Sequence, residues 1–147
     1  MLFPETKELY AERAEALRKT VAEKKAKQAE WEKQNPELAK ELKKYLSGNA
    51  PEIDYAAIEQ KADKATRAGS ATVLGTLAEK VGNMVVSSAD LSNSDKTDGF
   101  LKKTHAMKKG DFSGAFLQAG VSELTMACIM NGMALHGGII PVCATFF

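Results

Sequence analysis

The chain has 147 residues, a length that suits one domain or one small domain with a helical arm. Its hydrophobic content of 44% is ordinary for a globular protein, and its net charge of +1 gives no electrostatic case for binding nucleic acid or an anionic membrane. No apolar run reaches the roughly 18 residues of a membrane-spanning helix, and the N-terminus lacks the order of a signal peptide. Cys128 and Cys143 stand in apolar surroundings without disulfide or zinc spacing, so we expect buried free thiols and a reducing, cytoplasmic compartment.

The first part of the chain is predicted to be helical and highly charged. The first 66 residues hold 13 of the 20 basic and 13 of the 19 acidic side chains. Residues 5–31 are rich in Ala, Glu and Lys and lack Gly and Pro, which predicts one long helix with a thin apolar stripe. Asn35-Pro36 ends this helix, and Pro36 suits the first turn of a second helix that runs to Leu46, with Gly48 as its C-cap. Residues 49–54 are then predicted to form a linker.

The second part predicts alternating helices and strands. The expected elements are a helix over 66–80, a short buried strand at Val85-Val86, a long loop over 91–114, a strand over 115–120, a helix over 123–136 and a final apolar strand over 139–147. Strands that are apolar on both faces indicate a parallel sheet covered by helices, so the expected fold class is α/β. Three strands and two helices are too few to stand alone, and the chain stops on Phe146-Phe147. We therefore expect an incomplete sheet that continues in residues missing here.

Six short motifs point, in order along the chain, to one protein family. They are Pro36-Glu37-Leu38 through Leu46-Ser47-Gly48, Ala65-Thr66-Arg67, Ser88-Ala89-Asp90-Leu91, Gly120-Val121-Ser122-Glu123, Asn131-Gly132-Met133-Ala134-Leu135-His136-Gly137-Gly138 and Ala144-Thr145-Phe146-Phe147. Together they resemble the helical linker and the first half of the aminopyrimidine-binding domain of transketolases. On this resemblance, residues 1–55 are the linker arm and residues 56–147 are the first half of the pyrimidine-binding domain.

The resemblance implies an enzyme that transfers two-carbon ketol units between sugar phosphates on thiamine diphosphate. In that family a glutamate hydrogen-bonds the pyrimidine ring nitrogen and favours the imino form of the exocyclic amine. That amine then removes the proton from the thiazolium carbon. By position the glutamate is Glu123. Without the resemblance, Glu123 would be an acidic residue stabilised by the dipole at the start of a helix.

The resemblance assigns five further positions. Asp90, Val121 and Phe146 match positions at the cofactor pocket, and Arg67 and Ser94 match positions that bind the sugar phosphate. Arginine suits phosphate because its guanidinium donates two parallel hydrogen bonds. Each position also has a plainer explanation. An Asx turn accounts for the aspartate, core packing for the valine and the phenylalanine, and solvation for the arginine.

The chain departs from the family pattern in two places. Where the family usually has Arg-Glu-His, this chain has Ser122-Glu123-Leu124, so the glutamate keeps its place and loses both polar neighbours. The phosphate-binding domain with its Gly-Asp-Gly metal motif is absent, so we expect a domain outside this chain to hold the magnesium. Gly110-Asp111-Phe112 lacks the third glycine and follows no strand, and His105 and His136 have no ligand spacing. No metal site is therefore assigned to this chain.

Two functional hypotheses follow. The first is a transketolase segment that is inactive alone and acts on sugar phosphates within a homodimeric full enzyme, as the family implies. A sister family such as dihydroxyacetone synthase also fits, because the specificity residues lie mostly outside this chain. The second is a non-catalytic interaction protein, or one subunit of a split enzyme, that binds its partner through the charged helices and the Met-rich helix over 123–136. Because half a sheet has an unpaired edge, we expect the isolated chain to form oligomers or aggregates.

Overall fold

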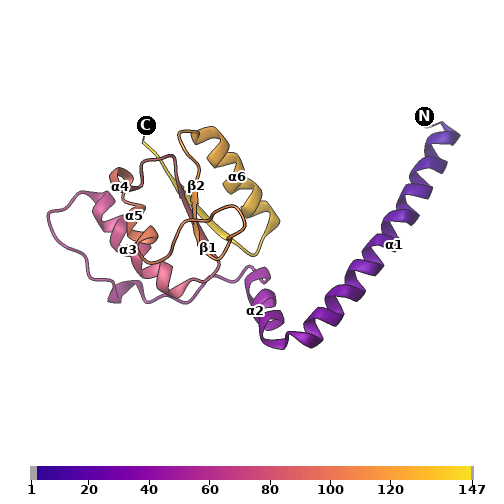
Figure 1. The fold of residues 1–147 in the computed structure, drawn as a ribbon, viewed down its shortest axis with the longest axis horizontal. Helices are drawn as coiled ribbons and strands as arrows, with labels where there is room; N and C mark the ends of the chain where they lie inside the picture. The colour runs from indigo at the N-terminus through magenta and orange to yellow at the C-terminus, as the bar shows by residue number, and fades with distance from the viewer. Residues whose placement is uncertain (1–2, 147) are drawn as a thin grey trace. The chain divides into compact units, whose positions relative to one another are not determined.

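The computed structural model describes residues 3–146, which form helices and three short strands (Figure 1). In chain order the elements are α1 (Pro4–Gln34), α2 (Pro36–Leu46), the 3-10 turn η1 (Tyr55–Ala57), α3 (Thr66–Lys80), β1 (Met84–Ser88), α4 (Ser92–Asp95), α5 (Asp98–Leu101), β2 (Phe116–Gln118), α6 (Glu123–His136) and β3 (Ile140–Ala144). Long N-terminal helices precede a parallel sheet, which confirms the predicted α/β class. The chain divides into two compact units, residues 1–43 and residues 44–147.

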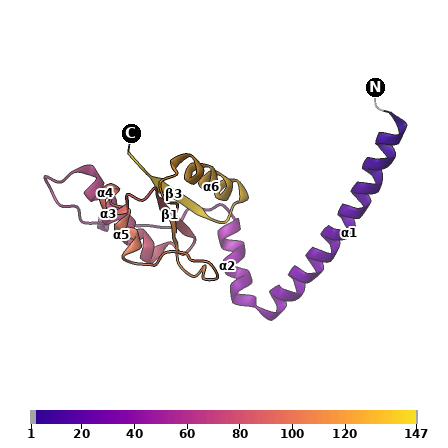
Figure 2. The ribbon, with the colours of Figure 1, turned by 45° about the horizontal axis from the view of Figure 1, so that its top comes forward.

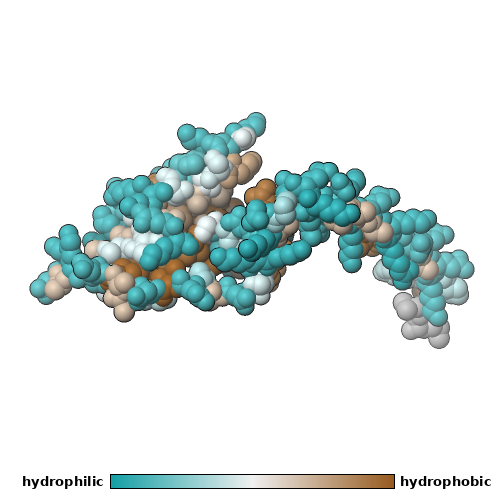
Figure 3. Space-filling model, turned by 90° about the horizontal axis from the view of Figure 1, so that it is seen from below, coloured by the Kyte–Doolittle hydropathy of each residue, from teal (hydrophilic) through white to brown (hydrophobic). Residues whose placement is uncertain are grey.

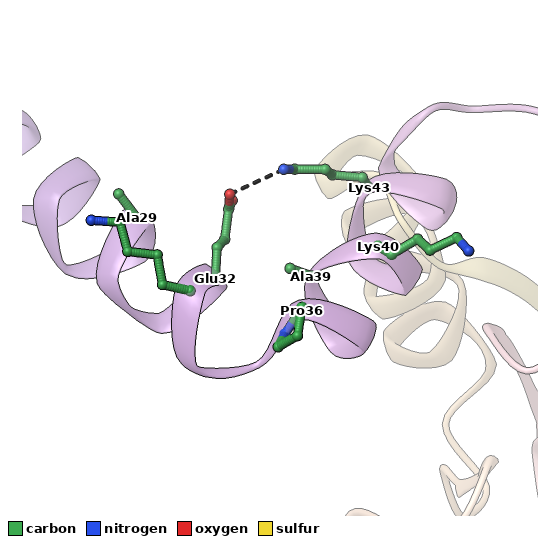
Figure 4. Close-up of a pocket in the computed structure, with 7 residues that line it drawn as sticks. Ala29, Glu32, Pro36, Ala39, Lys40 and Lys43 are labelled. Carbon is green, nitrogen blue, oxygen red and sulfur yellow. Dashed lines mark hydrogen bonds and ion pairs between the residues drawn. The ribbon is translucent and has the colours of Figure 1, made fainter.

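The first unit is almost entirely helical and has little core. α1 spans 31 residues without a buried side chain, and its surface is mostly hydrophilic with a few separate apolar residues (Figure 3). The helix ends before Asn35, as Pro36 predicts, and Asn35 leaves helical geometry with φ −132° and ψ 63°. Across this break the Lys43 Nζ lies 3.0 Å from the Glu32 Oε2 (Figure 4). The hydrogen bond from Lys43 lowers the pKa of the Glu32 carboxyl.

The second unit is built on a three-stranded parallel sheet in the order β2-β1-β3. Val86 in the middle of β1 pairs with Phe116 of β2 and with Val142 of β3. All five residues of β1 are buried, as expected for a strand with a neighbour on each side and a helix layer on each face. Because the strands are parallel, their carboxyl ends lie at one edge of the sheet.

Helices lie on both faces of this sheet, which gives the second unit three layers (Figures 1 and 2). On one face α3 packs against α5, and α6 lies on the other face against β3. The main core is formed by Leu74, Val81, Met84, Val86, Phe100 and Phe116. On its own face α6 buries Met126 and Met130. Each large apolar side chain buried in this way stabilises the fold by about 1.5–3 kcal/mol.

The packing of α3 on α5 depends on Gly99. A Cβ atom at this position would collide with the backbone carbonyl of Ala71. Gly99 therefore lets the backbones of the two helices approach more closely than any other residue would allow.

The structure corrects two sequence-based predictions. The segment over 91–114, predicted to be a loop, contains α4 and α5 and buries Phe100 in the core. Each of these helices is about one turn long, which is too short to give a periodic apolar pattern. Cys128 and Cys143, predicted to be buried, are both exposed. The reason is that α6 packs on the sheet with the side that carries Met126 and Met130 and leaves Cys128 exposed, while β3 is an edge strand.

The other elements differ from prediction mainly at their ends. β1 is longer than the predicted Val85-Val86, whereas β2 and β3 are shorter than predicted. The predicted end of the last strand at Phe147 lies outside the described residues. Within residues 3–146, no helix combines the length and apolar character needed to cross a membrane.

Candidate functional site

The carboxyl edge of the sheet holds four of the six residues assigned from the sequence. Asp90 follows β1, Val121 and Glu123 follow β2, and Phe146 follows β3. In Figure 1 the short helix α4, the start of α6 and the C-terminal end of the chain lie at this same end of the sheet. In open α/β sheets, ligands bind outside the carboxyl ends of the strands. This edge is therefore the candidate site.

Glu123 is the first residue of α6. It is exposed, and within residues 3–146 its side chain has no hydrogen bond or ion pair. Ser122 precedes it at the N-cap but does not cap the helix with its side chain. Instead the Ser122 hydroxyl donates a hydrogen bond to the Ala119 carbonyl at 2.6 Å. The Glu123 carboxyl is thus left available to a ligand.

Two apolar side chains are exposed at the same edge. Val121 is 79% exposed and Phe146 is 49% exposed. Neither one belongs to the core, so core packing does not explain them in this structure. An aliphatic side chain and an aromatic ring that both face solvent suit the flat face of a heteroaromatic ring.

Asp90 lies where β1 ends and has a left-handed backbone with φ 63°. It borders a small hollow between β1 and β2, whose other walls are Ser88, Ser92, Phe116, Gln118 and Gly120. The hollow measures about 30 Å³, which is room for about one water molecule. The edge is thus an open wall rather than a closed pocket.

Arg67 and Ser94 lie on the helices that flank this edge. Arg67 is the second residue of α3, is exposed, and has no partner within the described residues. A short turn over 81–83 joins the end of α3 to the start of β1, so the beginning of α3 lies towards the carboxyl edge. Ser94 lies in α4, where its hydroxyl contacts Asn93 Oδ1 at 3.3 Å. No hydrogen bond or ion pair joins any two of the six assigned residues in the described chain.

A buried polar network beneath the edge escaped the sequence-based reasoning. The Ser88 hydroxyl donates to Asp95 Oδ2 at 2.6 Å, and Asp95 Oδ1 accepts hydrogen bonds from Thr97. All three residues are buried. The available signal was the Asp95-Lys96-Thr97 spacing, because aspartate side chains commonly accept from the backbone two residues ahead.

Gly110-Asp111-Phe112 lies in a turn that precedes β2, on the amino-terminal side of that strand. Asp111 Oδ1 accepts from the Ser113 hydroxyl at 2.5 Å and from the Ser113 backbone at 3.1 Å, and these bonds lower the pKa of the Asp111 carboxyl. His105 Nε2 lies 3.1 Å from the same hydroxyl. Within residues 3–146, no group of three or more His, Cys, Asp or Glu side chains is placed to hold a metal ion.

Residues 62–147, more than half of the chain, match the family described as the transketolase pyrimidine-binding domain. The chain belongs to the transketolase family. The resemblance inferred from the six motifs is confirmed, and the match to transketolases also reaches the N-terminal helices. The transketolase of Geobacillus stearothermophilus is 34% identical over 147 residues and aligns with 95% of this chain.

Other transketolases give the same result. The transketolase of Halalkalibacterium halodurans is 38% identical over 122 residues, which cover 81% of this chain. The alignments cover 18% of that transketolase and 22% of the Geobacillus protein, so this chain spans only a small part of its curated relatives.

Solved transketolases share the fold. A transketolase structure from Pichia stipitis, in complex with sedoheptulose-7-phosphate, matches 99% of this chain and 23% of its own, with a TM-score of 0.81 and 29% identity. A transketolase from Leishmania mexicana matches 87% of this chain and 20% of its own, with a TM-score of 0.76 and 28% identity.

The edge of this transketolase chain fits one part of thiamine diphosphate. The pyrimidine ring needs an apolar surface for its face and a carboxyl for its ring nitrogen. Val121, Phe146 and Glu123 offer both at the same edge of the sheet. Within the described residues, no group of three or more His, Cys, Asp or Glu side chains is placed to hold the metal of the diphosphate.

Proposed function

We propose that this chain forms the pyrimidine-binding wall of a transketolase, with Glu123 as its catalytic carboxyl. The full enzyme transfers two-carbon ketol units between sugar phosphates. One observation carries the proposal: Glu123 is exposed at the carboxyl edge and is unpaired within the described residues. Membership of the transketolase family supports thiamine diphosphate as the ligand of that unpaired carboxyl.

Glu123 acts by holding a proton at the pyrimidine ring nitrogen. When bound, thiamine diphosphate supplies the carbon that carries the ketol unit. A hydrogen bond that involves a charged group contributes about 1.5–3 kcal/mol. A positioned proton-transfer group contributes about 10²–10⁴ in rate. One carboxyl therefore accounts for much of the activation.

The neighbouring side chains bind and orient the ring. Val121 and Phe146 contact its faces and exclude water from the carboxyl, which strengthens the hydrogen bond that Glu123 makes. Asp90, held at the end of β1, lines the cofactor pocket beside them.

Arg67 and Ser94 bind the sugar phosphate. The guanidinium of Arg67 is exposed and unpaired in the described chain, so it can donate two parallel hydrogen bonds to a phosphate. Ser94 offers a hydroxyl donor from α4. Sugar phosphate binding by the Pichia stipitis enzyme supports this substrate class.

The isolated 147 residues are inactive in this proposal and form oligomers or aggregates. Within the described sheet β2 and β3 each have one unpaired edge, and Leu124 and Leu135 of α6 are exposed. In the full protein a second copy of the chain completes the site, and a domain beyond these residues holds the magnesium. Residues 1–55 serve as the linker arm and residues 56–147 as part of the pyrimidine-binding domain. The free thiols suit a cytoplasmic location.

A chimeric enzyme tests the proposal. This chain replaces the aligned segment of the Geobacillus stearothermophilus transketolase, and ketol transfer is measured with thiamine diphosphate and magnesium. We expect an active chimera in which Glu123→Gln lowers kcat by about 10²–10⁴. The matched control is Glu79→Gln on α3. This change also removes an exposed carboxylate, one that is paired with Lys103. A Glu123→Gln chimera with unchanged kcat would refute the catalytic role.

The second hypothesis, a non-catalytic interaction protein, has one supporting observation. α1 is 31 residues long and buries none of its side chains, so most of its surface is open to a partner. A folded, dimeric chimera that binds thiamine diphosphate but transfers no ketol unit would favour this hypothesis over the first.

A further inference from the structure

The segment from Ser88 to Thr97 joins the end of β1 to α5 and carries both Asp90 and Ser94. Its two non-glycine residues with left-handed backbone are Asp90, with φ 63°, and Lys96, with φ 70°. Such residues cost free energy and persist only where the surrounding structure fixes them. Something in this segment must therefore hold both positions.

Each left-handed residue lies inside a short hydrogen-bonded turn, here called a bracket, in which a buried side chain accepts the hydrogen bonds. The Leu91 amide donates to Ser88 Oγ at 3.1 Å, which closes a bracket around Asp90. The Thr97 amide and hydroxyl donate to Asp95 Oδ1 at 2.9 and 2.8 Å, which closes a second bracket around Lys96. The two brackets are joined by the hydrogen bond from Ser88 to Asp95.

Asp95 closes the second bracket and is joined to the first through Ser88. Its carboxylate is buried and accepts three hydrogen bonds, and no cation in the described chain forms an ion pair with it. A buried carboxylate is tolerated only when donors surround it, so the three donors and the loop conformation depend on one another. Every buried polar side-chain atom among the described residues has a partner. The network is therefore complete without any ligand.

We infer that Asp95 is a positioning residue for the sugar phosphate, because it locks the loop that presents Asp90 and Ser94 to the carboxyl edge. This inference rests on the proposed function for the identity of the ligand and on the hydrogen bonds alone for the locking. Asp95 touches neither substrate nor cofactor. It acts through α4, whose Ser94 and Asp95 amides both donate to the Leu91 carbonyl.

Hydrogen exchange on the 147-residue chain tests the locking, with variants that open one bracket at a time. Asp95→Ala removes the second bracket and the hydrogen bond that joins it to the first, so the Thr97 amide exchanges about tenfold faster, the factor that corresponds to one lost hydrogen bond. The Leu91 amide also exchanges faster, because its acceptor Ser88 is no longer held by Asp95. Asp95→Asn keeps an oxygen for Thr97 but places an NH₂ group against Ser88, so exchange rises mainly at Leu91. Thr97→Val removes one donor to Asp95 Oδ1 and raises exchange mainly at Thr97. Asp98→Ala, which breaks only the ion pair with Lys102, is the control.

Kinetics of the chimeric enzyme test the connection to substrate. For a phosphorylated ketol donor, Asp95→Ala raises KM about tenfold and leaves kcat unchanged, as expected when ground-state and transition-state binding are lost equally. Asp95→Asn restores part of this loss. For a ketol donor without a phosphate, KM does not change in either variant. A general loss of structure would instead lower kcat for both donors.

The outcomes separate the two proposals. Unchanged exchange at Leu91 and Thr97 in Asp95→Ala overturns the locking. Faster exchange with an unchanged KM for the phosphorylated donor overturns the positioning role. A chimera that is inactive with Asp95 in place refutes the proposed function, whereas the exchange data still decide whether Asp95 locks the loop.

Discussion

Ser122 donates its hydroxyl to the Ala119 carbonyl at 2.6 Å and leaves the first turn of α6 without a side-chain cap. The hydrogen bond closes the turn between β2 and α6 on itself. Within that turn Gly120 has φ 66° and Val121 faces solvent. The position of Glu123 relative to the sheet therefore depends on the hydrogen bond of the serine before it.

Ser122→Ala should destabilise the second unit, because the Ala119 carbonyl loses its side-chain donor. The expected loss is about 0.5–1.5 kcal/mol in the free energy of unfolding. Denaturant unfolding followed by circular dichroism measures it. Ser70→Ala is the control, because Ser70 is an exposed residue of α3 whose hydroxyl makes no hydrogen bond in the described chain. This change should shift the free energy of unfolding by no more than about 0.5 kcal/mol. Equal effects of the two changes would contradict the role of the Ser122 hydroxyl.

Gly99→Ala should separate α3 from α5. The new methyl group would meet the Ala71 carbonyl, and overpacking of this kind costs about 1–3 kcal/mol. Gly132→Ala on α6 is the matched substitution, because nothing lies within 4 Å of the added carbon. It should stabilise the helix by up to about 1 kcal/mol, since alanine is the better helix former. Thermal unfolding of the two variants should move in opposite directions, and a shared direction would refute the close packing.

Phe100→Ala should be among the most damaging single changes in the chain. Phe100 is 1% exposed and fills the core beneath the sheet, so truncation should cost about 3–5 kcal/mol. Phe112→Ala removes the same side chain from a residue that is 78% exposed, and it should leave stability nearly unchanged. If both variants unfolded at the same denaturant concentration, α5 would not be part of the core.

Asp111 should titrate below the ordinary range of an aspartate. The Ser113 hydroxyl, the Ser113 amide and the charge of His105 all lower the pKa of its carboxyl. Because the folded-state pKa is lowered, the stabilisation is present above the unfolded-state pKa and is lost as the pH falls through the folded-state value. Because Ser113→Ala removes the hydroxyl donor, the midpoint of an NMR titration of the Asp111 carboxyl should move to higher pH in this variant. An unmoved midpoint would show that the Ser113 hydrogen bonds do not set it.

The sequence predicted the long elements well because each had a local signal. Pro36 and the glycine-free stretch before it fixed the break between α1 and α2, and the helices over 66–80 and 123–136 match prediction at both ends. The predicted strands were correct in place but differed in length, since strand ends depend on pairing across the sheet. That pairing is not encoded in any short window.

The burial of individual residues was harder to predict than the elements. Cys143 looks like a core residue from its apolar neighbours, yet its exposure depends on β3 being an edge strand. Asp95 looks like an ordinary surface aspartate, yet its burial depends on Ser88 and Thr97 arriving together. The positions of Asp90, Val121, Glu123 and Phe146 at one edge followed from the parallel order of the strands. Their chemical roles came from the family and stay predictions.

The central place of β1 in the sheet has a consequence for synthesis on the ribosome. Both partners of Val86, Phe116 and Val142, come later in the chain than Val86 itself. A nascent chain that has emerged only as far as α5 holds β1, the strand whose five residues are all buried in the fold, without either neighbour. Pairing over such long sequence separations is intrinsically slow. β1, the most buried strand of the folded protein, is thus the part of the chain that most needs a chaperone during synthesis.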